Sequence, residues 1–223
     1  MSILELKDVC YSYSAEKPVL RGMNCTFECG TLYALVGKSG AGKSTLLSLM
    51  AGLDLPDSGQ VLFEGTSTGD MDLDEYRRRK AAVIYQDFAL FPLLTALENI
   101  EYPMELCRVE AQEAERQARE LARRVSLPDE LLDRYPTHIS GGEQQRVAIA
   151  RGLTMGRRLL LADEPTGNLD SENSDNIIDL LLRLAHEENR CVIVVTHDLT
   201  VMDRADVVYR ISDGLLQRRQ KEQ

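Results

Sequence analysis

The eight residues from Gly37 to Ser44 constrain the fold of this chain more than any other feature. They read Gly-Lys-Ser-Gly-Ala-Gly-Lys-Ser and fit the pattern G-x-x-x-x-G-K-[ST]. The apolar residues 32–36 precede this segment and the apolar-rich residues 46–50 follow it. A strand, a glycine-rich loop and a helix thus come in the order that a phosphate-binding loop requires.

The residue types of this loop suit a polyphosphate ligand. Glycines at 37, 40 and 42 let consecutive backbone N–H groups turn toward phosphate oxygens, and the following helix directs its positive end at the same charge. We expect Lys43 to reach the β- and γ-phosphates and Ser44 to offer its hydroxyl to Mg²⁺. A glycine-rich turn without a ligand fits poorly, because glycines, lysine and serine are all in register. The predicted phosphate-binding residues are Gly37, Lys38, Ser39, Gly40, Ala41, Gly42, Lys43, Ser44 and Thr45.

Two adjacent carboxylates follow a second apolar run. Residues 159–162 read Leu-Leu-Leu-Ala, and Asp163 and Glu164 come directly after them. A carboxylate at the end of a buried strand is held rigidly, so we assign Asp163 to the Mg²⁺ water shell. Glu164 beside it is the expected general base on the γ-phosphate side. A solvated acidic turn is a weaker interpretation, because the run before it contains no polar residue.

Length, composition and charge limit the class of protein. A chain of 223 residues with 43% hydrophobic content can bury a core and form one domain with an inserted lobe. The net charge of −10 disfavours a nucleic-acid partner, since binding a phosphate backbone needs a basic surface. No apolar run approaches the roughly 18 to 20 residues that span a bilayer, and the N-terminus lacks a signal-peptide core. We therefore expect a cytoplasmic location.

Hydrophobic patterning predicts an α/β fold. Alternating or continuous apolar runs indicate strands at residues 3–11, 23–28, 31–36, 60–63, 82–85, 158–162, 191–196 and 207–210. The first three form an antiparallel opening, with Gly30 in a turn. Helical spacing indicates helices at residues 72–80, 110–124 and 171–188, and an almost wholly helical stretch at 95–155. The alternation of strands and helices after residue 157 predicts a mainly parallel sheet with helices on its faces.

The predicted architecture is a single domain over residues 1–223. Residues 1–87 and 157–223 form a P-loop NTPase core with an antiparallel N-terminal β subdomain, and residues 88–156 form an inserted α-helical lobe. That lobe ends on the segment Ile-Ser-Gly-Gly-Glu-Gln-Gln-Arg at residues 139–146. Its serine and glycines begin a helix, whose positive end is a second site for a γ-phosphate.

The motifs, in their order along the chain, resemble those of the ATP-binding cassette family of transporter ATPases over essentially the whole chain. Residues 161–170, Leu-Ala-Asp-Glu-Pro-Thr-Gly-Asn-Leu-Asp, and residues 86–100 most resemble the subgroup of lipoprotein-release, macrolide-export, cell-division and antimicrobial-peptide-resistance ATPases. The signature departs from the family by Ile-Ser-Gly-Gly-Glu in place of Leu-Ser-Gly-Gly-Gln, and Gly152 stands where a helix prefers alanine. Neither departure removes a phosphate-contacting group.

The resemblance implies a Mg²⁺-dependent ATPase with ATP and Mg²⁺ as cofactors. Gln86 then contacts Mg²⁺ or the attacking water, and His197, at the end of another apolar run, holds the γ-phosphate and Glu164. Two cassettes pair head to tail, so that each ATP lies between one phosphate loop and the signature of the other chain. The residues implied for that second contact are Ser140, Gly141, Gly142, Glu143 and Asp170. Tyr13 is the expected adenine-stacking residue, with Tyr11 as the alternative.

The resemblance also implies a membrane partner. An apolar cluster follows Gln86, and we expect it to contact an integral-membrane permease; it comprises Phe88, Leu90, Phe91, Pro92, Leu93 and Leu94. We thus predict a peripheral ATPase subunit on the cytoplasmic face of the membrane, in an export-type or mechanical complex. Two alternatives stay open: a soluble cassette ATPase acting on DNA or ribosomes, and a nucleotide-gated tether with little turnover.

Overall fold

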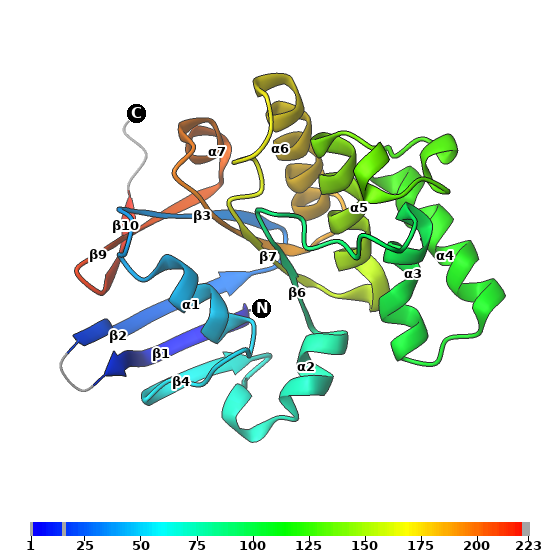
Figure 1. Ribbon diagram of the computed structural model, residues 1–223. Coiled ribbons are helices and arrows are strands. Elements are labelled where there is room, and N and C mark those ends of the chain that lie inside the picture. Colours follow the sequence, from blue (N-terminus) through cyan, green and yellow to red (C-terminus); the bar gives the residue numbers. More distant parts are fainter. Residues whose placement is uncertain (1, 15–16, 220–223) are drawn as a thin grey trace.

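The computed structural model describes residues 2–14 and 17–219, which form two sheets and their covering helices (Figure 1). The smaller sheet has the strand order β2-β1-β4-β5 and is antiparallel. Its strands are β1 (Ser2–Ser14), β2 (Lys17–Glu28), β4 (Ser58–Phe63) and β5 (Thr66–Ser67). The larger sheet has the order β10-β9-β3-β8-β7-β6 and is parallel except at β10. Its strands are β3 (Thr31–Gly37), β6 (Ala81–Ile84), β7 (Leu159–Asp163), β8 (Cys191–Val195), β9 (Val207–Ser212) and β10 (Leu215–Arg219).

The prediction that β3 belongs to an antiparallel opening is wrong. After the turn at Gly30, which has a φ of 79°, β3 leaves the small sheet and lies between β8 and β9, parallel to both. The five residues 32–36 are all buried, and burial on both faces is typical of a parallel strand covered on each side. The α/β class and the mainly parallel sheet are as predicted.

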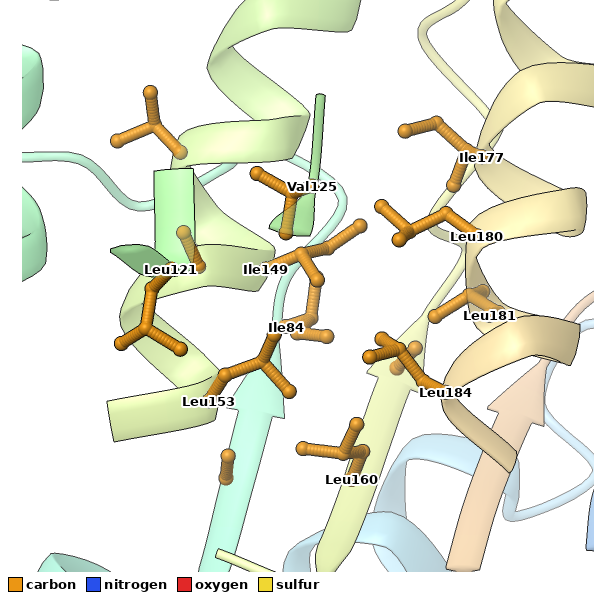
Figure 2. Close-up of a cluster of buried hydrophobic side chains, with 14 of the residues drawn as sticks. Ile84, Leu121, Val125, Ile149, Leu153, Leu160, Ile177, Leu180, Leu181 and Leu184 are labelled. Carbon is orange, nitrogen blue, oxygen red and sulfur yellow. The ribbon is translucent and has the colours of Figure 1, made fainter. Parts of the chain in front are cut away.

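Each central strand of the large sheet sends alternate side chains into two separate cores. On β3, Ala34 joins the core under helices α3 to α6, whereas Leu35 joins the core under α1 and the small sheet. On β7, Leu160 joins the first of these cores and Leu161 joins the second. Figure 2 shows the first core, where Leu160 faces side chains of α5 and α6. The helices are α1 (Lys43–Met50), α2 (Leu73–Arg79), α3 (Ala96–Leu106), α4 (Ala111–Arg124), α5 (Gly141–Leu153), α6 (Ser171–His186) and α7 (Leu199–Arg204).

Helices α3, α4 and α5 pack together beside the large sheet (Figure 1). The last carbonyl groups of α4 are capped from neighbouring helices: Arg146 Nη1 of α5 donates to the Val125 oxygen at 2.6 Å, and the Arg183 guanidinium of α6 donates to the Arg124 oxygen. Cations at the end of a helix also complement its dipole. The boundaries of an inserted lobe at residues 88 and 156 stay a prediction.

Two C-terminal elements were not predicted. The hairpin between β9 and β10 turns at Asp213 and Gly214, with φ values of 53° and 77°, which are the signs that a two-residue type I′ turn requires. Asp-Gly is a strong hairpin signal, so the polar residues of β10 could have been assigned to a strand. Helix α7 has only six residues and begins at an Asp198 cap, too short for periodicity to reveal. Across residues 2–14 and 17–219, none of the helices has the length and apolar character to span a bilayer.

Gly152 lies near the end of α5, and we expect Gly152→Ala to stabilise the chain by about 0.5–1 kcal/mol. A Cβ at this position would meet Ala82 Cβ at 3.5 Å and Ile84 Cγ1 at 3.7 Å, which are ordinary contacts. Gly156→Ala is the matched control: it has open space but a φ of 66°, so it should destabilise. Urea unfolding measures both changes, and a lower midpoint for Gly152→Ala would contradict the expectation.

Candidate active site

The phosphate loop joins the end of β3 to the start of α1. Gly42 caps α1 with a φ of 97°, and a Cβ there would lie 2.8 Å from Leu20 Cδ2, so only glycine fits. Lys43 folds its side chain back over the loop, where Nζ donates to the Gly37 oxygen at 2.9 Å and the Lys38 oxygen at 3.3 Å. The loop therefore presents an ammonium group and a helix N-terminus to one place.

Tyr13 and Tyr11 lie beside this loop in different environments. Tyr13 is 72% exposed, and its hydroxyl lies 2.9 Å from Oγ1 of Thr45 in the first turn of α1. The Tyr11 hydroxyl donates to Asp54, and this bond raises the pKa of Tyr11 to about 12. The two rings meet edge to face at 5.2 Å. Tyr13 is thus the tyrosine with a ring free to stack and an anchor on the phosphate-loop helix.

Asp163 is the last residue of β7 and lies next to the phosphate loop. Burial, and then the charge of Glu164, raise the pKa of the Asp163 carboxyl above its ordinary value. The Ser44 hydroxyl, through a hydrogen bond, and the Lys43 ammonium act in the opposite direction. The structure therefore brings Asp163, Ser44 and Lys43 into one cluster.

Glu164 is fixed at both its backbone and its carboxylate. Its φ of 47° is unusual for a residue with a Cβ, and its N–H donates to the Val195 oxygen at 2.8 Å. Oε2 accepts from Thr196 Oγ1 at 3.1 Å and from the His197 N–H at 3.3 Å, and Oε1 lies 2.8 Å from His197 Nδ1. Thr196 was missed in the sequence analysis, because a threonine after an apolar strand carries no signal of its own.

The environments of Glu164 and His197 differ in exposure. The Glu164 side chain is 15% exposed and the His197 side chain is 77% exposed. A cavity of about 440 Å³ opens beside this pair, and Thr166, Gly167 and Asp198 contribute to its wall. Glu164 and His197 thus both line an open cavity.

Gln86 lies just after β6 and touches the loop that follows Glu164. Asn168 Nδ2 donates to the backbone oxygen of Gln86 at 2.8 Å. A Cβ on Gly167 would come within 3.0 Å of Gln86 Nε2, so this glycine permits the close approach. The structure therefore places Gln86 with the Glu164 loop, although β6 and β7 are far apart in the sequence.

The signature residues begin α5 with a capping box. Ser140 Oγ accepts from the Glu143 N–H at 3.4 Å, and Glu143 Oε2 accepts from the Ser140 N–H at 2.6 Å. A Cβ on Gly142 would lie 2.6 Å from Oδ1 of Asn173 in α6. Asp170 caps α6 by accepting from the Asn173 N–H and side chain at 2.9 Å each, which lowers the pKa of Asp170. The predicted second site is therefore built of two neighbouring helix starts.

The two predicted phosphate contacts lie on opposite faces of the large sheet. Side chains of α1 enter the core shared with the small sheet, whereas those of α5 enter the core shared with α3, α4 and α6. Figure 1 shows α1 and α5 separated by the strands β6 and β7. The structure therefore does not bring Ser140, Gly141, Gly142 and Glu143 together with the phosphate loop of the same chain.

The apolar cluster after Gln86 is partly buried. Leu90 packs against the core and Phe88 is half-buried, whereas Leu93 is 86% exposed and Phe91 is 42% exposed. Asn99 of α3, which is fully buried, holds this segment by accepting from the Phe91 N–H and donating to three backbone oxygens between residues 91 and 95. The segment thus presents Leu93 and Phe91 outward from a fixed backbone.

A family model described as ABC transporter matches residues 20–167. Among proteins of similar sequence, "Lipoprotein-releasing system ATP-binding protein LolD 2" of Rhodopirellula baltica is 42% identical over 96% of this chain and 89% of its own length. "Uncharacterized ABC transporter ATP-binding protein YclH" of Bacillus subtilis is 37% identical over 96% and 95%. The cassette MJ0796 of Methanocaldococcus jannaschii, solved as a dimer bound to ADP and Pi, has 35% identity, covers 99% of both chains and superposes with a TM-score of 0.88.

The fold and these relatives define a nucleotide-binding cassette of the P-loop type. The chain belongs to the ABC transporter family, as an ATP-binding subunit. The family and the fold are thus those predicted from the sequence, and relatives named for lipoprotein release and macrolide export represent the expected subgroup. The roles of the individual site residues stay predictions.

We expect Asp163→Asn to make the chain more stable than wild type at pH 7.5. Because the folded state raises the pKa of Asp163, the ionised carboxylate costs stability at neutral pH, and this cost is absent below the ordinary pKa of aspartate, about pH 4. The gain should therefore vanish on acidification. Asp170→Asn is the control and should instead lower the stability at pH 7.5, since the folded state lowers the pKa of Asp170. Urea unfolding at several pH values tests this, and an Asp163→Asn variant weaker than wild type at pH 7.5 would refute it.

Proposed function

We propose that this chain is a Mg²⁺-dependent ATPase that works as a pair of cassettes and moves a membrane permease, in an export-type or mechanical complex. The observation that carries the proposal is the Glu164 carboxylate, which Thr196 and His197 hold beside Asp163 and the phosphate loop. A base held in this way is suited to orient and deprotonate water. The ADP and Pi bound to the related cassette MJ0796 support hydrolysis as the reaction.

The side chains proposed to hold Mg²⁺ carry the donor atoms that it prefers. The Ser44 hydroxyl, the Asp163 carboxylate and the Gln86 amide offer oxygen atoms, the ligand type that Mg²⁺ prefers while keeping several waters. The raised pKa of Asp163 supports this, because a nearby dication would offset the burial of its charge. When bound, Mg²⁺ neutralises the charge that develops on the β- and γ-phosphate oxygens.

The residues of the chain then divide the work of hydrolysis. Lys43 leaves its loop carbonyls for the phosphates, and Glu164 accepts a proton from the attacking water. His197 Nδ1–H donates to the Glu164 carboxylate, so Nε2 can donate to a γ-phosphate oxygen only when the ring is doubly protonated. Tyr13 carries the adenine, because its exposed ring is anchored through the hydroxyl on Thr45.

A second copy of the chain completes the site. The signature helix α5 and the phosphate-loop helix α1 cover opposite faces of the large sheet, so we assign Ser140, Gly141 and Gly142 to the nucleotide of the partner cassette. In that arrangement Ser140, Glu143 and Asp170 lie at helix starts, whose N–H groups favour an anion. The dimers reported for MJ0796 support a pair of cassettes. Hydrolysis then depends on assembly.

Glu164→Gln tests the reaction. We expect kcat to fall at least about 100-fold, because the general base is lost, while ATP binding persists. The variant should therefore accumulate as an ATP-dependent dimer in size-exclusion chromatography, and wild-type specific activity should rise with chain concentration. Glu187→Gln, on the exposed end of α6, is the matched control and should behave as wild type.

A concentration-independent rate with Glu164→Gln as fast as wild type would overturn the base assignment and the shared site. Absence of turnover in wild type would favour the nucleotide-gated tether.

The permease contact is proposed at the segment from Phe88 to Leu94. Leu93 and Phe91 are exposed on a backbone that Asn99 and the core fix, so the segment can accept a partner without first becoming ordered. Phe91 also packs on Tyr102 of α3, with ring centroids 4.7 Å apart, so the segment is in direct contact with that helix. Binding there would place the chain at the membrane surface, on the cytoplasmic face.

We expect Leu93→Asp to abolish co-purification with a polytopic membrane protein while ATP binding stays within twofold of wild type. A charge at the centre of an apolar contact is costly, whereas the free chain tolerates it because Leu93 is 86% exposed. Leu90→Asp would be ambiguous, since Leu90 packs on the core. Leu215→Asp on β10, at the opposite edge of the sheet, is the control. Detergent extraction and mass spectrometry provide the measurement, and unchanged recovery with Leu93→Asp would refute this contact.

A further inference from the structure

The backbone just after Gln86 adopts an unusual conformation. Phe88 and Ala89 have φ values of 62° and 47°, in the left-handed region that residues with a Cβ rarely adopt. The Phe88 N–H donates to the Tyr85 oxygen at 3.1 Å, so Gln86 lies within the same turn. Two such residues in succession persist only where their surroundings hold them.

Arg151, in the last turn of α5, holds both residues. Its Nη1 donates to the Ala89 oxygen at 2.7 Å and its Nη2 donates to the Phe88 oxygen at 3.0 Å. Burial lowers the pKa of the Arg151 guanidinium, and the Tyr85 phenol acts against this shift. The planar guanidinium thus donates to two neighbouring backbone carbonyl oxygens at once. A lysine ammonium cannot bridge the two oxygens with the same geometry.

Gln86 is therefore held from two sides. On one side its backbone oxygen accepts from Asn168, and its side chain lies against Gly167 in the loop after Glu164. On the other side the chain continues directly into the pair that Arg151 fixes. The contacts run without a gap from the Glu164 loop, through Gln86, to the helix that begins at Ser140.

We propose that Arg151 is a positioning residue for Gln86. By fixing the carbonyl groups of Phe88 and Ala89, it keeps the Gln86 amide beside the Glu164 loop and makes that placement depend on the position of α5. The expected effect on kcat rests on the proposed function, whereas the expected effect on the placement of Gln86 does not.

The experiment compares wild type with Arg151→Ala, Arg151→Lys and the double variant Arg151→Ala/Ala89→Gly. We expect Arg151→Ala to lower kcat about tenfold and to change KM for ATP less than twofold, because the phosphate loop and Tyr13 are untouched. Arg151→Lys, which keeps the charge and most of the side chain, should fold and lose a similar factor. Glycine adopts positive φ without support, so the double variant should have a kcat at least threefold higher than that of Arg151→Ala.

Two further measurements separate positioning from general destabilisation. Arg183→Ala removes a guanidinium that also donates to a backbone carbonyl, that of Arg124 at the end of α4, and should lower the unfolding temperature without lowering kcat. Hydrogen exchange of the peptide covering residues 86–90 should accelerate at least tenfold in Arg151→Ala and Arg151→Lys, and not in Arg183→Ala.

The outcomes distinguish this inference from the proposed function. Wild-type turnover with unchanged kcat in both Arg151 variants, or unchanged exchange over residues 86–90, overturns the inference. A kcat loss that Ala89→Gly does not relieve overturns it as well. If wild type does not hydrolyse ATP but exchange accelerates as expected, the proposed function fails and the positioning role of Arg151 stands.

Discussion

Burial of the large sheet on both faces is the constraint on which the rest of this structure depends. The small sheet with α1 covers one face and helices α3 to α6 cover the other, so the central strands are held rigidly between two cores. Because β3, β6, β7 and β8 are parallel, their carboxyl ends lie at one edge. The phosphate loop, Gln86, Asp163 with Glu164, and His197 follow those four ends, which is why residues distant in sequence share one site.

The same architecture explains why one chain holds only half of the proposed site. The helix after the phosphate loop covers one face and the helix after the signature covers the other, so the two helix starts proposed to bind phosphate belong to different sides of the sheet. The capping box of Ser140 with Glu143 and the Asp170 cap order two neighbouring helix starts. This surface is preformed, and a second cassette would meet little cost of ordering it.

The site also concentrates conformations and charges that work against stability. Glu164 has a positive φ, Phe88 and Ala89 follow Gln86 with the same sign, and burial disfavours the charge on Asp163. The two backbone features are each held by a specific neighbour: the β8 carbonyl of Val195 accepts from the Glu164 N–H, and the Arg151 guanidinium donates to the Phe88 and Ala89 carbonyls. Such features are typical of functional sites, where geometry is selected over local preference.

The sequence by itself determined the phosphate loop, the strand-end acids, the α/β class and the family, because glycine spacing and apolar runs report local backbone and burial. It did not determine that β3 leaves the first sheet, since a buried run has the same pattern in either sheet. Thr196 on Glu164 and Arg151 on Phe88 and Ala89 were equally hidden, because those contacts join residues 32 and more than 60 positions apart. Only the tertiary structure decided them, because strand order and helix packing, which are long-range choices, set which side chains meet.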